Sequence, residues 1–250
     1  MIALKTSLMS GVKEKLARGE VVYSMTACLV KTFDIASIAY TAGFDSLYIY
    51  MESSSFSLEA AGQLCMACIG LGVTPFVRIP SPDPHFIARM LDSGALGIFV
   101  PRVQSAEDAR AIVRAARHVQ FHYRLPPAAD ATPQLDEATM IIAMIESLEG
   151  LDAVEEIAAV EGVDILLVDG NELSIALGVS DEMDHDLVRN AYRRVLHACL
   201  ANSKVLGIGG LGSRPDLIKE LLALGARYVS TGNDISFLLD AAVRKRQQFT

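Results

Sequence analysis

The stretch TMIIAMIESLEGLDAVEEIAAVEGVDILLVDG, residues 139–170, decides the fold class of this 250-residue chain. Its two ends, 139–145 and 163–168, are nearly unbroken apolar runs, which are typical of strands that are buried on both faces of a parallel sheet. The segment between them, 148–160, repeats apolar residues at helical spacing. A strand, a helix and a second strand in this order predict one unit of a parallel α/β fold.

The same alternation continues along the whole chain in both directions. Eight strand-like runs occur, with amphipathic helical patterns between them. Eight such units in a chain of this length favour a closed (β/α)₈ TIM barrel over an open sheet, and we expect one domain over residues 1–250. The predicted strands are 21–26, 45–50, 73–78, 96–100, 139–145, 163–168, 204–208 and 226–230.

Three glycines mark the ends of predicted helices, and one unusual segment interrupts the alternation. Gly70, Gly94 and Gly225 follow helical stretches, where we expect them to end the helices as C-caps. Residues 118–138 are polar and rich in proline, and they break the alternation. A connection of this length is typical of a functional loop or of a disordered segment.

Composition narrows the classes of function. The chain carries 30 acidic side chains against 22 of Lys and Arg, a formal net charge of −8, and an acidic chain without a basic stripe is poorly suited to binding nucleic acid. No uncharged apolar run of about 18 residues predicts a membrane span. The amino terminus becomes charged too early for a signal peptide, so we expect a cytoplasmic protein with no membrane partner.

Two of the four cysteines, Cys65 and Cys68, have the internal spacing of half a zinc site. They lie within an apolar helical pattern, and neither a second pair nor a histidine cluster follows them. We therefore interpret them as buried helix thiols rather than as a metal or redox pair.

Polar residues follow several of the predicted strands, and in such barrels the active site lies at the carboxyl ends of the strands. Arg78 ends one strand, Glu146 follows another, and Asp169-Gly170-Asn171-Glu172 follows the next. Glu146 and Glu172 together suit a hard cation such as Mg²⁺ or Mn²⁺. Arg78 suits a substrate carboxylate or an enolate oxygen. An ion pair of Arg78 with a glutamate, closing the mouth of the barrel, is the equally weighted alternative.

With these residues in place, the chain resembles the HpcH/HpaI aldolase/citrate lyase family, whose barrels are of the phosphoenolpyruvate/pyruvate type. The stretches that carry the resemblance are AGFDSLYIYMES (42–53), GVTPFVRIPSPDP (72–84), LDSGALGIFVPRVQSAEDAR (91–110), 145–178 and LGARYVSTGNDISFLLDA (224–241).

The resemblance implies a lyase that cleaves or forms 4-hydroxy-2-oxo acids through a pyruvate enolate. It implies a divalent metal (Mg²⁺, Mn²⁺ or Co²⁺) at Glu146 and Glu172, where the family usually has Asp at the second position. It places enolate stabilisation on Arg78, the acid partner of a catalytic histidine on Asp92, and the substrate carboxylate near Asn171 and Glu172. The partners implied are a small 2-oxo acid and an aldehyde, and the chain is expected to form a homo-oligomer, a trimer or a hexamer.

Several positions depart from the family pattern. The family's Asp-x-Glu-His reads Tyr50-Met51-Glu52-Ser53 here, so Glu52 is retained and Ser53 replaces the catalytic histidine. A family glutamine is Met144, and together with Tyr50 it makes the expected substrate pocket more apolar. Serine has no useful basicity near neutral pH, so the base is left open, with His122 and Tyr123 as candidate substitutes.

These residues are compatible with three alternative functions. The first is the metal-dependent aldolase. The second is a decarboxylase of oxaloacetate-like 2-oxo acids, or an enzyme of other enolate carbon–carbon chemistry, which needs the metal and Arg78 but no base for a hydroxyl. The third is a catalytically silent barrel that binds a ligand, because the departures gather around one pocket.

Overall fold

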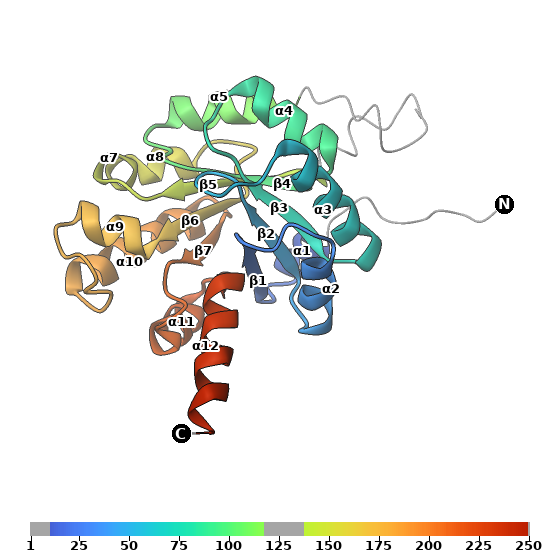
Figure 1. Ribbon diagram of the computed structural model, residues 1–250. Coiled ribbons are helices and arrows are strands. Elements are labelled where there is room, and N and C mark those ends of the chain that lie inside the picture. Colours follow the sequence, from blue (N-terminus) through green and yellow to red (C-terminus); the bar gives the residue numbers. More distant parts are fainter. Residues whose placement is uncertain (1–10, 118–137, 250) are drawn as a thin grey trace.

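The computed structural model describes residues 11–117 and 138–249. Eight parallel strands form a barrel in chain order (Figure 1). The barrel is closed because β8 pairs back onto β1. The predicted (β/α)₈ TIM barrel is therefore confirmed, and each predicted strand is found within three residues at either end. Within the described ranges, no helix is long and apolar enough to cross a lipid bilayer. The strands are β1 (Val22–Ala27), β2 (Ser46–Tyr50), β3 (Thr74–Arg78), β4 (Gly97–Val100), β5 (Met140–Ile145), β6 (Ile165–Asp169), β7 (Val205–Gly209) and β8 (Tyr228–Asn233).

Helices surround the barrel and connect one strand to the next (Figure 1). They are α1 (Gly11–Ala17), α2 (Asp34–Thr41), α3 (Leu58–Leu71), α4 (Pro84–Ser93), α5 (Ala106–Ala116), α7 (Leu148–Asp152), α8 (Val154–Ala158), α9 (Gly170–Ala176), α10 (Asp186–Ala201), α11 (Pro215–Leu224) and α12 (Asp234–Gln247). The helix predicted over 148–160 is thus two short helices, α7 and α8, which meet at Ala153.

The barrel interior is filled by large side chains, many of them aromatic. Tyr48 stacks on Phe99 with ring centroids 4.2 Å apart. Gly97 makes this packing possible, since a Cβ there would lie 2.6 Å from the Met140 carbonyl oxygen and 2.9 Å from the Phe76 ring. The interior is therefore a packed core, and it supports the residues at the carboxyl ends of the strands.

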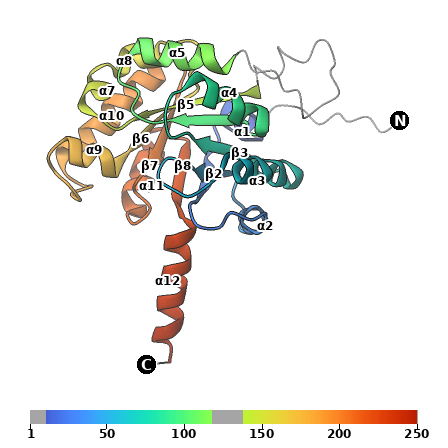
Figure 2. The same ribbon diagram turned by 45° about the horizontal axis from the view of Figure 1, so that its top comes forward.

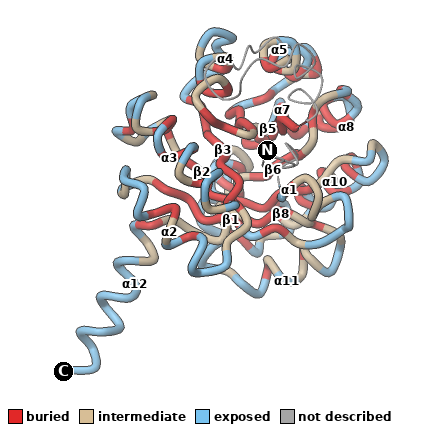
Figure 3. The backbone as a smooth tube through the Cα atoms, turned by 90° about the vertical axis from the view of Figure 1, so that its right-hand side faces the viewer, coloured by how far each residue is buried: buried red, intermediate tan, exposed pale blue. Residues whose placement is uncertain are grey.

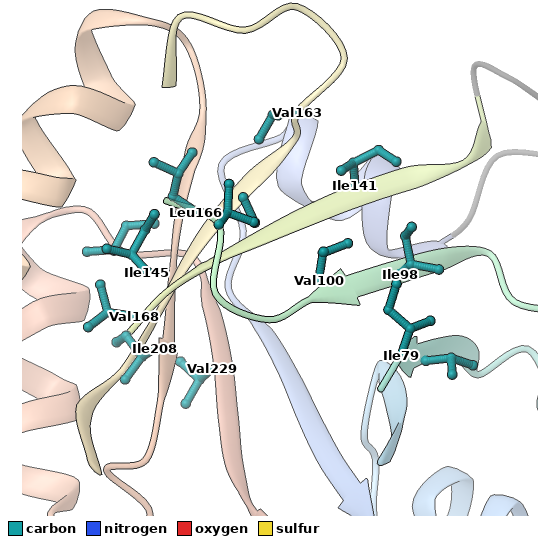
Figure 4. Close-up of a cluster of buried hydrophobic side chains, with 14 of the residues drawn as sticks. Ile79, Ile98, Val100, Ile141, Ile145, Val163, Leu166, Val168, Ile208 and Val229 are labelled. Carbon is teal, nitrogen blue, oxygen red and sulfur yellow. The ribbon is translucent and has the colours of Figure 1, made fainter. Parts of the chain in front are cut away.

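A larger apolar layer lies between the strands and the helices (Figure 4). Strand β5 serves both layers, because Ile141 and Ile145 belong to the outer layer while Ile142 and Met144 belong to the interior. Side chains of a strand alternate between its two faces, and here both faces are buried. This is why the strands of the sequence read as unbroken hydrophobic runs.

The predicted helix ends are largely confirmed. Gly94 and Gly225 follow α4 and α11 as expected. The prediction that Gly70 ends its helix is wrong, because α3 continues through Leu71 and ends at Gly72. The φ of Gly72 is +79°, the left-handed conformation that a helix C-cap favours and that glycine adopts without steric cost.

The cysteines of α3 are buried helix thiols, as predicted. Cys65 and Cys68 both lie in the outer apolar layer. Burial raises the pKa of Cys68 to about 12, so this thiol is protonated and unreactive near neutral pH.

The last helix, α12, extends away from the barrel instead of lying along it (Figures 1 and 2). Beyond its first turn it is exposed along most of its length (Figure 3). Its apolar side chains Leu238, Leu239 and Val243 are 62%, 60% and 45% exposed. A helix with this much uncovered apolar surface is unusual for a chain that acts alone.

Candidate active site

A cavity of about 890 Å³ opens at the carboxyl ends of the strands. Its floor is formed by Tyr48, Met144 and Leu167, which belong to the barrel interior. The predicted residues Tyr50, Ser53 and Asn171 also line it. The charged side chains of its lining are Glu52, Arg78, Arg102, Glu146, Asp169, Glu172 and Asp240.

Arg78, the last residue of β3, lies at the centre of an acidic cluster. Its Nη2 is 2.6 Å from Oε2 of Glu52 and 3.2 Å from Oε2 of Glu146, and its Nη1 is 3.5 Å from Oδ2 of Asp169. The Tyr50 ring lies 5.3 Å from the guanidinium carbon. The Arg78 side chain is 7% exposed, and its Nε has no hydrogen-bond partner within the described residues. A buried guanidinium that lines a cavity is suited to an oxygen of a bound ligand.

Glu146 follows β5 directly, and its two carboxylate oxygens have different donors. Oε2 faces Arg78, while Oε1 accepts the backbone N–H of Arg102 at 2.9 Å. Burial raises the pKa of Glu146, Arg78 opposes this rise, and nearby Asp169 adds to it. The ion pair that was one interpretation of the sequence is therefore present, yet the carboxylate would still gain from a further positive charge.

Asp169 is the acid to which sequence reasoning gave no separate role. It ends β6 and caps α9, where its Oδ1 accepts the backbone N–H of Asn171 at 3.2 Å. Its Oδ2 faces Arg78. Gly210 leaves room for it, since a Cβ there would lie 2.8 Å from Oδ1 of Asp169. The signal that selected Glu146, an acid directly after a buried strand, applies equally to Asp169.

Glu172 lies exposed in the first turn of α9 and lines the same cavity as Glu146. In the part of the chain that the structure describes, no three His, Cys, Asp or Glu side chains are grouped as ligands around one point. Mg²⁺ needs only one or two protein carboxylates when substrate oxygens and waters complete its shell. Carboxylate oxygens are the ligands that such an ion prefers. The carboxylates of Glu146, Asp169 and Glu172, which line one cavity, are therefore chemically suited to a divalent cation.

Arg102, in the loop after β4, is a cavity residue that sequence reasoning missed. Its φ is +53°, a left-handed conformation that residues with a side chain seldom adopt. Its backbone N–H donates to Glu146, and its Nη2 lies 3.1 Å from Oε1 of Glu52. Unlike Arg78, its side chain is 71% exposed. The backbone and the side chain of Arg102 are thus each held by a carboxylate of the site.

Ser53 lies in the cavity wall at the position where the resemblance implies a histidine. The Tyr50 hydroxyl lies 3.5 Å from its Oγ, at the limit of a hydrogen bond. No histidine or lysine is found among the described residues of the lining. His122 and Tyr123, the proposed substitutes for the base, lie outside the described residues. The described cavity therefore offers no imidazole for proton transfer.

The structure does not bring Asp92 to the cavity. Asp92 lies in the last turn of α4. In a barrel of this kind the helices run antiparallel to the strands, so that turn lies at the end of the barrel opposite Arg78. The acid that the resemblance pairs with a histidine is thus remote from the described site of the same chain.

Comparison with known proteins gives a consistent result. A family model described as HpcH/HpaI aldolase/citrate lyase matches residues 28–241. The 4-hydroxy-4-methyl-2-oxoglutarate aldolase of Chaetomium globosum is 33% identical over 94% of this chain and 93% of its own length. The hydroxypyruvate/pyruvate aldolase of Delftia acidovorans is 33% identical over 92% and 89%. The crystal structure of an HpcH/HpaI aldolase from Desulfitobacterium hafniense matches with a TM-score of 0.86 and 26% identity over 95% of both chains.

Proposed function

The chain belongs to the HpcH/HpaI aldolase/citrate lyase family and is a carbon–carbon lyase, and we propose that it cleaves or forms 4-hydroxy-2-oxo acids through a pyruvate enolate. The observation that carries this proposal is Arg78, a cation buried among Glu52, Glu146 and Asp169 at the mouth of the barrel. A buried arginine beside carboxylates that can hold a divalent metal suits a reaction in which negative charge develops on a substrate oxygen.

We assign the residues separate tasks. Glu146 and Glu172 would hold the divalent metal, Mg²⁺, Mn²⁺ or Co²⁺, which supplies positive charge that stabilises the enolate. Arg78 donates to the substrate oxygen that becomes negative, and its burial strengthens that contact because little water competes for it. We assign the substrate carboxylate to the part of the cavity that Asn171 and Glu172 line.

Proton transfer is the part of the reaction that differs from the family pattern. Ser53 is a poor base, and the described lining holds no histidine or lysine. Decarboxylation of an oxaloacetate-like acid reaches the same enolate without taking a proton from a hydroxyl group. We therefore propose this decarboxylation as the second candidate, favoured by Ser53 itself.

The experiment that tests the proposal is release of pyruvate from racemic 4-hydroxy-4-methyl-2-oxoglutarate, followed with lactate dehydrogenase and NADH. We expect turnover that EDTA abolishes and that Mg²⁺, Mn²⁺ or Co²⁺ restores. Glu146→Gln should lower kcat at least about 10²-fold, whereas Glu149→Gln, an exposed acid on α7, serves as the matched control. No turnover with any of the three ions would contradict the aldolase, and turnover of oxaloacetate alone would favour the decarboxylase.

We also propose that the enzyme is a homo-oligomer, either a trimer or a hexamer. The support is α12, which carries exposed Leu238 and Leu239 away from its own barrel (Figure 2). Light scattering after size exclusion should give a mass several times that of the monomer, and Leu238→Glu with Leu239→Glu should lower it. A monomer in the unsubstituted protein would contradict this proposal.

A further inference from the structure

We infer that Arg102 is a specificity residue that binds a carboxylate on the part of the substrate remote from the 2-oxo acid group. The inference rests on the proposed function and adds a substrate class to it. The substrates would be 4-hydroxy-2-oxo acids whose second fragment is itself an acid, rather than those that release a neutral aldehyde.

The distribution of charge in the cavity points to Arg102. Among the described residues of the lining, Arg78 and Arg102 are the basic ones. An anionic arm that enters a cavity with more acidic than basic groups must meet a cation. Arg78 is buried and already faces three carboxylates, whereas Arg102 is exposed and faces one. The acidic residues of the lining are Glu52, Glu146, Asp169, Glu172 and Asp240.

Arg102 can change partners at little cost. Among the described residues its side chain pairs with Glu52, which uses Oε1 for Arg102 and Oε2 for Arg78, the latter at 2.6 Å. If Arg102 turns toward a ligand, Glu52 therefore keeps a cation and is not left as a buried, uncompensated charge. The pair that is broken involves an exposed arginine, and exposed ion pairs contribute little to stability.

The backbone that carries Arg102 is held firmly in an unfavourable conformation. Besides the bond from Arg102 N–H to Glu146, the N–H of Val103 donates to the carbonyl of Met144 at 3.3 Å. Helix α7 packs directly on the loop, since a Cβ at Gly150 would lie 2.6 Å from the Val103 carbonyl oxygen. A left-handed arginine enforced by its surroundings indicates a functional constraint, here the aim of its side chain over the cavity.

Binding of two matched ligands tests the inference without turnover. 2-Oxoglutarate and 2-oxopentanoate have the same carbon chain and differ in a terminal carboxylate or methyl group. By calorimetry with saturating Mn²⁺, we expect the unsubstituted enzyme to bind 2-oxoglutarate about 10- to 100-fold more tightly. Arg102→Gln should reduce that ratio to less than about threefold, and Arg102→Lys should keep part of it because it retains the charge but not the planar fork. Arg110→Gln, at an exposed arginine on α5, is the control.

Kinetics provide the second measurement. For Arg102→Gln, the loss of kcat/KM should be about tenfold or more greater with 4-hydroxy-4-methyl-2-oxoglutarate than with 4-hydroxy-2-oxopentanoate. Equal losses with both substrates, or a binding ratio that Arg102→Gln leaves unchanged, would overturn the inference and leave the proposed function intact. Lack of metal-dependent turnover in the unsubstituted enzyme would instead overturn the proposed function, and the binding ratio would then decide the inference alone.

Discussion

Arg78→Met removes the cation that three carboxylates share, and we expect it to destabilise the fold in a pH-dependent way. Arg78 faces Glu52, Glu146 and Asp169 within 3.5 Å. Methionine fills a comparable part of the space that the arginine stem occupies, so the effect should be chiefly electrostatic.

The magnitude follows from the burial of the charges left behind. The side chains of Glu52 and Glu146 are 10% and 3% exposed, so neither is well hydrated. Removing one partner of a buried ion pair costs about 3–5 kcal/mol, and because these groups border an open cavity we expect the lower end of that range. For a domain of this size the corresponding fall in Tm is about 6–12 °C at neutral pH.

The pH dependence comes from Glu146. Burial already raises the pKa of Glu146 above its ordinary value, and Arg78 opposes the rise. A group whose pKa is raised in the folded state contributes stability that is present at low pH and is lost as the pH rises through that pKa. Without Arg78 the pKa of Glu146 should rise further, so the variant should lose more stability than the unsubstituted protein between roughly pH 5 and pH 8.

Thermal and urea unfolding, followed by circular dichroism at these two pH values in the presence of EDTA, measures both effects. Arg78→Lys, which keeps the charge, is the matched control and should lose clearly less stability than the methionine variant. A loss that is the same at both pH values, or the same in the lysine and methionine variants, would refute the view that charge compensation by Arg78 holds the acidic cluster together.

Four further outcomes are expected. Ser53→His should raise the rate of aldol cleavage by up to about 10²-fold without a comparable gain in oxaloacetate decarboxylation, and an unchanged cleavage rate would show that this position no longer faces the reacting hydroxyl. Mn²⁺ at about 100 times its Kd should stabilise the protein by about 2.7 kcal/mol in thermal unfolding, and Glu146→Gln should abolish that gain. Asp234→Ala should lower the free energy of unfolding by about 2–4 kcal/mol, measured in urea, because the buried carboxylate accepts the backbone N–H groups of residues 28–30 at 2.7–3.0 Å. Gly97→Ala should lower the free energy of unfolding by about 1–3 kcal/mol in the same assay, since its Cβ would press on a carbonyl and an aromatic ring. An unchanged free energy of unfolding would show that the barrel interior can accommodate an additional methyl group.

The barrel could be predicted from the sequence because its strands have few alternatives. Residues buried on both faces must be apolar at nearly every position, so β5 and β6 stand out as unbroken runs. Helix α9, with seven residues, is too short to develop a clear apolar period and was not predicted. The ending of α3 at Gly72 instead of Gly70 shows that two nearby glycines leave a helix end ambiguous.

The site could be predicted only in part, for a physical reason. Arg78 ends a buried strand and Glu146 directly follows another, and a charge in either place must find a partner. Arg102 lies in a loop, and its contact with Glu52 joins residues 50 positions apart. No local sequence pattern therefore predicts that Arg102 belongs to the site. Asp169 follows the same pattern as Glu146, but the family motif places the second metal ligand at Glu172, so the pattern alone does not assign Asp169 a role.

The central claim is that this cavity forms a 2-oxo-acid enolate with the help of a divalent metal, Glu146 and Arg78. Proton NMR of pyruvate in D₂O tests it most directly, because an enzyme that converts the enolate to pyruvate also catalyses the reverse step, exchange of the methyl protons. The account predicts deuteration of the methyl group that requires both enzyme and metal and that Glu146→Gln and Arg78→Met abolish. Exchange no faster than with metal and buffer alone, or exchange that both variants retain, would contradict it.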